Sequence, residues 1–308
     1  MPEITIKSFA KINLSLDVGS VRDGYHEVDM VMQQLAFHDD VNVSFEPDPG
    51  PEKRIRLKTS RRYLPNDERN LAWRAAALMD REYGDQISGG TIGIRITKRI
   101  PVSAGMAGGS GNGAAVLHAL NVLWDLDLDL PTILRLSEEL GSDVPFCAAG
   151  QAAGNHDLPE RITKDPFAHP LARATGRGTK LEPYSGIRKP VVFAKPKGRV
   201  STKEVYQGID SCRITSRPDN TRLIRAIRSG SDEMYRDFIN VLEFYTLRAY
   251  PKVAVLKELM KNGPARRVLM TGSGPTVFGV YDSMDEAKAD SERIRNAGYE
   301  SYWTRTIR

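Results

Sequence analysis

The chain has 308 residues, of which 40% are hydrophobic and 27% charged, and its formal net charge is +5. This length and composition predict one large domain or two fused ones around a sizeable core, and the modest positive charge suits an enzyme for anionic ligands without indicating a nucleic-acid partner. Only two cysteines occur, so we expect neither a disulfide framework nor a zinc site. No apolar run approaches the roughly 20 residues that cross a bilayer, so we expect no membrane partner. Both observations favour a cytoplasmic location.

Short apolar or alternating runs predict strands at the start of the chain. These runs cover residues 4–6, 12–18, 28–35, 41–45 and, further along, 92–96. Between the last two runs, residues 70–83 predict a helix, because Leu71, Ala75 and Leu78 fall on one face.

The rest of the chain alternates between helices and strands. Helices are expected over residues 131–140, 221–227, 254–260 and 285–296, and strands over 191–194, 268–270, 277–281 and 299–304. This mixed order predicts an α+β fold in two lobes, which we place at residues 1–185 and 186–308.

The strongest chemical signal is the glycine-rich segment 101–115, which follows a strand and leads into a helix. Its glycines let the backbone approach a ligand and adopt positive φ; they are Gly105, Gly108, Gly109, Gly111 and Gly113. We expect the helix to begin near Ser110, where free N–H groups and the helix dipole favour an anion. The segment lacks the Gly-Lys-Ser/Thr ending of a Walker loop, and an ordinary tight turn is the alternative.

Three separated segments together carry a family resemblance. They are AKINLSLD at 10–17 with RDGYHE at 22–27, the glycine-rich segment, and TGSGPTVF at 271–278. In this order and spacing they resemble the GHMP kinases, the family of galactokinase, homoserine kinase and mevalonate kinase. RDGYHE and GSDVPF at 141–146 narrow the resemblance to members that act on a cytidine-diphosphate-linked polyol.

The resemblance implies a fold and a co-substrate. The fold is an N-terminal lobe like ribosomal protein S5 domain 2 followed by a ferredoxin-like C-terminal lobe, and the co-substrate is ATP. The positions that match the family's ATP-binding residues, the first two at the adenine, are Asn70, Lys98, Pro101, Gly105, Met106, Ala107, Gly108, Gly109, Ser110, Gly111 and Asn112. No His/Cys/Asp/Glu cluster has metal-ligand spacing, so we expect Mg²⁺ to arrive with ATP and keep several waters.

Two residues match the family's reacting centre. Asp143 matches the catalytic aspartate, and a carboxylate within reach of the acceptor hydroxyl can take its proton. Lys11 matches the catalytic lysine, whose ammonium can keep Asp143 ionised and offset charge on the transferred phosphoryl group. The residues alone leave a loop-capping aspartate and an edge-strand lysine open as alternatives.

Further matches concern the acceptor. Tyr25 and His26 match the base-binding pair and Tyr206 a second aromatic, which implies a cytosine between two rings with its edge hydrogen-bonded by His26. Taken singly, Tyr206 fits a core position equally well. The remaining acceptor-binding matches, beside Asp143 itself, are Asn13, Thr271, Gly272 and Ser273.

Residues 154–173 depart from the family's pattern as an insertion of about twenty residues. Three prolines and a polar composition predict an exposed loop, with His156 and His169 as surface histidines rather than metal ligands. Because the insertion lies a few residues from Asp143, it could form a lid or alter the acceptor pocket.

Two other functions remain open at this point. One is a GHMP kinase for another acceptor, of the homoserine or mevalonate type, and the other is a non-catalytic nucleotide-binding homologue. Tyr25, His26 and Tyr206 favour an acceptor with a base, and the presence of Lys11 and Asp143 argues against a non-catalytic chain. The sequence leaves the oligomeric state open.

Overall fold

The computed structural model describes residues 2–22, 24–50 and 52–308, which fold into two compact units. The first unit contains the chain up to Ala10, Phe37–Val102 and Ala107–Pro170, and the second contains Lys11–Ala36, Ser103–Met106 and Leu171–Arg308. The two strands that open the chain contribute to both units. The division into family lobes at residue 185 stays a prediction.

These opening strands are longer than the sequence predicts. Four short strands were expected, whereas β1 (Glu3–Arg22) has 20 residues and β2 (Tyr25–Pro47) has 23. The prediction was wrong because polar residues such as Lys11 and Asp39 interrupt the apolar pattern. Both are nevertheless buried within the strands.

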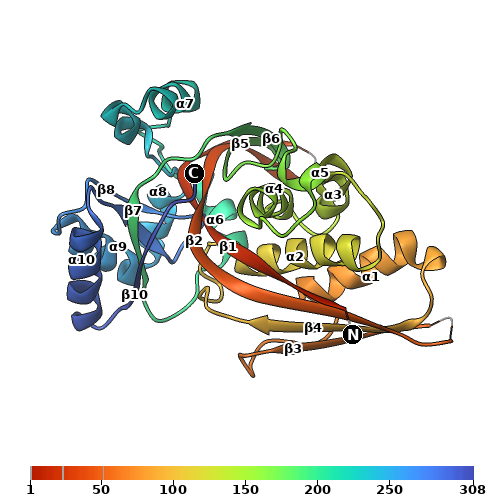
Figure 1. Ribbon diagram of the computed structural model, residues 1–308. Helices are drawn as coiled ribbons and strands as arrows, with labels where there is room; N and C mark the ends of the chain where they lie inside the picture. Colours follow the sequence, from red (N-terminus) through yellow and green to blue (C-terminus); the bar gives the residue numbers. More distant parts are fainter. Residues whose placement is uncertain (1, 23, 51) are drawn as a thin grey trace. The chain divides into compact units, whose positions relative to one another are not determined.

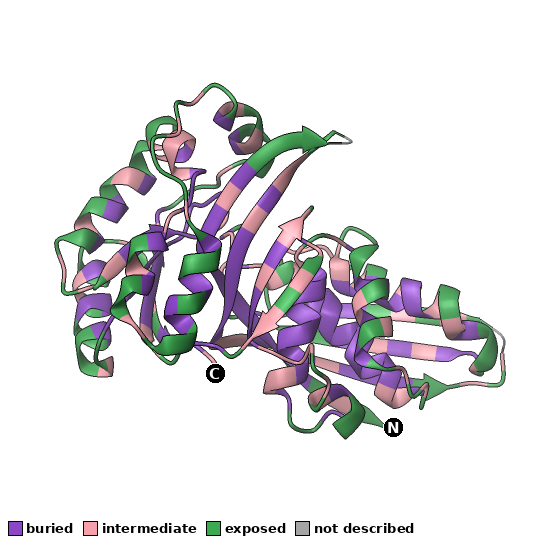
Figure 2. Cartoon of the chain, turned by 90° about the horizontal axis from the view of Figure 1, so that it is seen from above, coloured by how far each residue is buried: buried purple, intermediate pink, exposed green. Residues whose placement is uncertain are grey.

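The first unit packs helices on one side of a sheet (Figure 1). In the sheet, β4 pairs antiparallel with β2 and parallel with β3. The further elements of this unit are β3 (Lys53–Thr59), α1 (Leu71–Tyr83), η1 (Gly84–Gln86), β4 (Gly90–Thr97), α2 (Gly108–Leu123), α3 (Leu130–Glu138), α4 (Val144–Gly154) and α5 (Glu160–Thr163). The predicted helices α1 and α3 and the strand β4 are confirmed, and the inner faces of the helices are buried together with alternate residues of β4 (Figure 2).

The insertion is not the exposed loop that the sequence predicts. Gly154 still belongs to α4, and Asn155 hydrogen-bonds both backbone groups of Lys7, at 2.8 and 3.1 Å. Leu158 and Ile162 are buried in the core of the first unit. These two buried apolar residues, one before α5 and one within it, anchor the segment in spite of its prolines.

The two histidines of the insertion differ in exposure. His156 is exposed, as expected, but His169 is half-buried. Among the described residues, no group of three or more His, Cys, Asp or Glu side chains could hold a metal ion. None of the helices in the described part of the chain has the length and apolarity that a membrane span requires.

The second unit contains a four-stranded antiparallel sheet with the order β10-β7-β9-β8. Its elements beyond β1 and β2 are β5 (Leu171–Gly176), β6 (Lys180–Tyr184), β7 (Pro190–Lys195), α6 (Thr202–Ile209), α7 (Asn220–Ser229), η2 (Asp232–Asp237), α8 (Glu243–Ala249), α9 (Pro251–Lys261), β8 (Arg267–Met270), β9 (Val277–Val280), α10 (Met284–Asn296) and β10 (Glu300–Arg305). With α9 and α10 packed beside the sheet (Figure 1), β7, α9, β8, β9, α10 and β10 form the βαββαβ order of a ferredoxin-like fold, which confirms that prediction.

Candidate active site

The glycine-rich segment leads into α2 as predicted, but the helix begins at Gly108, two residues before the expected start. Its N-cap is Ala107, at φ 55°, and the side chain of alanine has no group that could cap a helix. The first N–H groups of a helix have no intrahelical acceptor, and the helix dipole adds positive charge there. This end of α2 therefore suits a phosphate group.

Most glycines of the segment do not adopt a positive φ, contrary to the prediction. Gly105 does, at φ 70°, but the others lie within α2. Their role is steric: a Cβ at Gly108 would lie 2.9 Å from Lys98 Nζ, and one at Gly111 would lie 2.5 Å from Ser8 Oγ. Gly109 differs, because it is exposed and its Cβ would meet only Leu71 Cδ1, at 3.8 Å.

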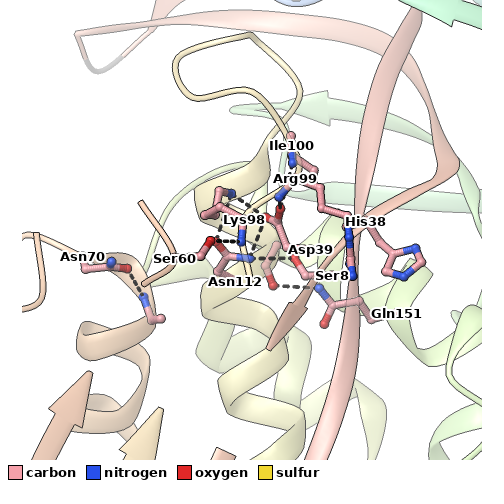
Figure 3. Close-up of polar contacts among 12 residues, drawn as sticks. Ser8, His38, Asp39, Ser60, Asn70, Lys98, Arg99, Ile100, Asn112 and Gln151 are labelled. Carbon is pink, nitrogen blue, oxygen red and sulfur yellow. Dashed lines mark hydrogen bonds and ion pairs between the residues drawn. The ribbon is translucent and has the colours of Figure 1, made fainter. Parts of the chain in front are cut away.

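A buried polar network surrounds the first turns of α2 (Figure 3). Lys98 forms an ion pair with Asp39, which lies on β2 and is fully buried. Lys98 Nζ also donates to Asn112 Oδ1 at 3.2 Å, so two predicted nucleotide residues are brought together. Lys98 thus has a compensating carboxylate within the protein.

Asp39 is the centre of this network, and sequence reasoning missed it. Its Oδ2 accepts from Asn112 Nδ2 at 3.0 Å, and its Oδ1 accepts from the backbone N–H groups of Arg99 and Ile100 at 2.7 and 2.8 Å. Asn112 Nδ2 also donates to Ser8 Oγ at 3.1 Å. Asp39 therefore fixes the backbone before the glycine-rich segment and the first turns of α2 with one carboxylate.

The neighbouring carboxylate, Asp40, is a contrast. Arg99 Nη2 donates to Asp40 Oδ2 at 2.7 Å, and this bond, opposed by partial burial, lowers the pKa of the Asp40 carboxyl. Both side chains are substantially exposed to solvent. The two adjacent aspartates thus form one buried and one surface ion pair.

The other predicted nucleotide residues of the first unit have local roles. Asn70 is the N-cap of α1: its Oδ1 accepts from Ala72 N at 3.1 Å (Figure 3), and its Nδ2 donates to Pro65 O at 2.9 Å. Pro101 and Ser110 are half-buried. The predicted contact of Asn70 with adenine stays a prediction.

Asp143 occupies the N-cap position of α4, with helical backbone angles and a half-buried side chain. Pro145 in the first turn has the φ that a helix start requires. Further along α4, Gln151 Nε2 donates to Gly111 O at 2.7 Å, which ties α4 to the first turn of α2. Helix α4, which has Asp143 at its N-cap, is therefore fixed to α2.

His118 on α2 shows that a conspicuous titratable residue can be purely structural. It is fully buried, and its Nε2 donates to Ala148 O at 3.0 Å. Burial lowers the pKa of His118 to about 4, against a smaller opposing effect of that hydrogen bond. The ring is therefore neutral at pH 7 and belongs to the core.

In the second unit, the structure brings several predicted residues into one buried cluster. Lys11 is 3% exposed, and its Nζ donates to Asn13 Oδ1 at 2.8 Å. The same oxygen accepts from Gly272 N at 3.0 Å, while Asn13 N donates to Thr271 Oγ1 at 3.1 Å. Lys11 N also donates to Met106 O at 3.2 Å. Lys11, Asn13, the Thr271 hydroxyl and the backbone N–H of Gly272 are thus held together.

The turn after Thr271 is itself tied down. Gly272 and Gly274 have φ of 57° and 92°, the left-handed region that favours glycine. A Cβ at Gly105 would lie 2.6 Å from Thr271 O, which explains why Gly105 is needed beside this turn. Asn240, missed by sequence reasoning, donates its Nδ2 to Met270 O and Gly272 O, each at 2.8 Å. Ser273 Oγ lies 2.9 Å from Thr202 Oγ1 at the start of α6.

Two of the three predicted base-binding side chains, His26 and Tyr206, lie near one another in the second unit. The rings of His26 and Tyr206, on α6, have centroids 5.8 Å apart. His26 Nδ1 lies 3.2 Å from Gly19 O, so that nitrogen carries a proton, and Nε2 lies 3.4 Å from Asp210 Oδ2. Tyr25 is 56% exposed. These three side chains are therefore more accessible than the cluster around Asn13.

The fold and these features define a class. The family models described as the N-terminal domain and the C-terminal domain of GHMP kinases match residues 70–151 and 217–300, respectively. Together with the relatives described next, they show that the chain belongs to the GHMP kinases, which confirms the family and fold predicted from its sequence.

The chain is similar to particular members of this family. It is 40% identical over 299 residues to the 4-diphosphocytidyl-2-C-methyl-D-erythritol kinase of Alkaliphilus metalliredigens, covering 96% of this chain and 93% of the relative. It is 44% identical over 285 residues to the kinase of the same name from Geobacillus kaustophilus, covering 91% and 88%. A crystal structure of 4-(cytidine 5′-diphospho)-2C-methyl-D-erythritol kinase superimposes with a TM-score of 0.76 at 28% identity, covering 99% of this chain and all of that one.

Proposed function

We propose that this protein transfers the γ-phosphoryl group of ATP to the 2-hydroxyl of 4-diphosphocytidyl-2-C-methyl-D-erythritol, a step of non-mevalonate isoprenoid precursor biosynthesis. The observation that carries the phosphoryl-transfer part is the start of α2, where an uncapped helix end follows a glycine-rich turn. The acceptor is supported by the shared name of the relatives at 40% and 44% identity. Acceptors of the homoserine or mevalonate type carry no base, so they give the aromatic residues Tyr25 and Tyr206 no role.

The residues at the start of α2 fit the phosphates of ATP. The N–H groups of Gly108, Gly109 and Ser110 donate hydrogen bonds to phosphate oxygens, and the exposed Gly109 lets these oxygens approach the backbone. Asn70 and Lys98 line the adenine side, and Pro101 with Gly105–Asn112 surrounds the phosphates. Bound ATP supplies the phosphoryl group, and Mg²⁺ bound to its phosphates offsets their charge and keeps several waters.

At the reacting centre, two residues have complementary roles. Asp143 accepts the proton of the acceptor hydroxyl, and the Lys11 ammonium stabilises negative charge on the transferred group. Asn13 holds the Lys11 ammonium through the 2.8 Å hydrogen bond, so Lys11 is oriented before substrates bind. Phosphoryl transfer depends mainly on such positioning and charge stabilisation.

The acceptor is recognised at its base and along its polyol. Tyr25 and Tyr206 stack on the cytosine, and His26 reads its edge. Asn13, Thr271, Gly272 and Ser273 bind the polyol side, where the turn at Gly272 brings backbone groups close to the ligand.

An ADP-release assay with a panel of acceptors tests this function. With ATP and Mg²⁺, we expect turnover with 4-diphosphocytidyl-2-C-methyl-D-erythritol and none above background with mevalonate or homoserine. Turnover with either of the last two alone would contradict the assignment of the acceptor. Absence of turnover with all three would contradict the assignment as a kinase for these alcohols.

A further inference from the structure

An exposed arginine is stacked on one of the proposed base-binding rings. The guanidinium carbon of Arg177 lies 3.8 Å from the centroid of the Tyr25 ring. Tyr25 is 56% exposed, and Arg177 is exposed as well. A guanidinium within about 6 Å of an aromatic centroid is attracted to the face of the ring. Arg177 therefore covers one face of Tyr25.

The backbone explains how Arg177 reaches this ring. Strand β5 runs antiparallel to β2 with Gly176 opposite Val28, so the chain beyond Gly176 continues toward the start of β2, where Tyr25 lies. Gly176 and Gly178 have φ of 66° and 92°. Gly178 N donates to Thr175 O at 3.1 Å, which closes a tight turn with Arg177 inside it. The position of the arginine is thus fixed by a turn that requires glycine on both sides.

We propose that Arg177 is a positioning residue of the acceptor site, which holds the plane of the Tyr25 ring and leaves its opposite face for the cytosine. This inference rests on the proposed function. A planar guanidinium stacks on an aromatic face while its N–H groups remain in water, so the contact orders the ring without burying a charge. Arg177 acts through the ring and does not contact the acceptor.

Steady-state kinetics of variants test this role. Arg177→Met removes the cation but keeps a long side chain, and we expect it to raise the acceptor KM about two- to fivefold, as an exposed cation–π contact implies. The kcat and the KM for ATP should not change. Arg177→Lys should retain most of the effect because its ammonium can still lie over the ring. Arg225→Met, which removes an exposed arginine from α7, is the matched control and should behave as wild type.

A double variant distinguishes a positioning role of Arg177 from direct binding of the acceptor. In Tyr25→Ala, the additional change Arg177→Met should leave the acceptor KM where Tyr25→Ala alone puts it, because the arginine then has no ring to orient. A further rise in this background would overturn the proposal, since Arg177 would then contact the acceptor itself. An unchanged KM in the single variant, or an equal rise in the KM for ATP, would also overturn it.

Nuclear magnetic resonance of the protein without substrates tests the stack separately from the function. The ring current of Tyr25 should shift the Arg177 Nε–H proton signal upfield, and Tyr25→Leu should return the signal to its ordinary position. A signal that Tyr25→Leu does not move would overturn the stack even in an active kinase. An inactive wild type that shows the shift would instead refute the proposed function, and the role of Arg177 in acceptor binding with it.

Discussion

The polar network around Asp39 and the contact between Tyr25 and Arg177 are built in opposite ways. Asp39 is fully buried and each of its oxygens accepts two hydrogen bonds or ion-pair contacts, whereas Tyr25 is 56% exposed and its ring lies against the exposed Arg177. A buried, fully satisfied network rigidifies its surroundings, and its loss is costly. We infer that the proposed nucleotide site is ordered by the core of the protein, while the proposed base site is assembled on its surface. Substitutions should therefore affect stability in the first region and specificity in the second.

Two glycines of α2 give the largest expected effect. Gly109→Val should abolish ATP binding in a folded protein, because the added Cβ has room within the protein but lies where the phosphates approach. Gly111→Ala is the contrasting variant: its Cβ would lie 2.5 Å from Ser8 Oγ, so it should destabilise the fold. Isothermal calorimetry and thermal unfolding of both variants measure the difference. Unchanged ATP affinity in a folded Gly109→Val protein would remove the start of α2 from the phosphate site.

The two neighbouring aspartates provide the next test. Asp39→Ala leaves the Lys98 ammonium buried without its carboxylate and should lower the free energy of unfolding by about 3–5 kcal/mol. Asp40→Ala removes a surface ion pair with Arg99 and should cost no more than about 1 kcal/mol. Urea denaturation of the two variants gives both values. Equal losses in the free energy of unfolding would show that the buried network stabilises the fold no more than the surface ion pair does.

His118 should make stability depend on pH. Because burial lowers its folded pKa to about 4, below its unfolded value, the unfolded state binds more protons between these two values and stability falls on acidification. Between pH 7 and pH 5 the loss from His118 should be about 2 kcal/mol. His118→Gln should remove this part of the pH dependence, and His156→Gln, at an exposed position, should leave it. Identical pH profiles of wild type and His118→Gln would contradict the assignment.

The smallest effect is expected at the base site. Tyr25→Ala should raise the acceptor KM about fivefold. This factor corresponds to about 1 kcal/mol, which an aromatic contact contributes beyond its buried area. ATP affinity and thermal stability should not change, since the ring is exposed. Tyr63→Ala, at a tyrosine that is 66% exposed, is the control. If the acceptor KM of Tyr25→Ala equals that of wild type, the cytosine does not stack on this ring.

The same contrast explains what the sequence could predict. Helices α1 and α3 were predictable because their apolar residues recur at helical spacing and because they carry the local start signals Asn70 and Pro131. The role of Asp39 was not predictable, because its partners Lys98 and Asn112 are 59 and 73 residues away in sequence and only the fold brings them together. Residues 154–173 were mistaken for a loop because two buried residues, Leu158 and Ile162, outweigh three prolines. Arg177 gave no signal of its own, since it lies in a turn and its partner Tyr25 lies on β2, far away in the sequence.

The role of Asp143 tests the central claim most directly. In a single-turnover experiment with bound ATP and 4-diphosphocytidyl-2-C-methyl-D-erythritol, we expect wild type to transfer the phosphoryl group and Asp143→Asn to do so about 10²–10⁴ times more slowly, because the amide cannot accept the hydroxyl proton. Both substrates should still bind to the variant, which calorimetry checks. Equal transfer rates in the two proteins would remove Asp143 from the mechanism, and absence of transfer in wild type would contradict the proposed function itself.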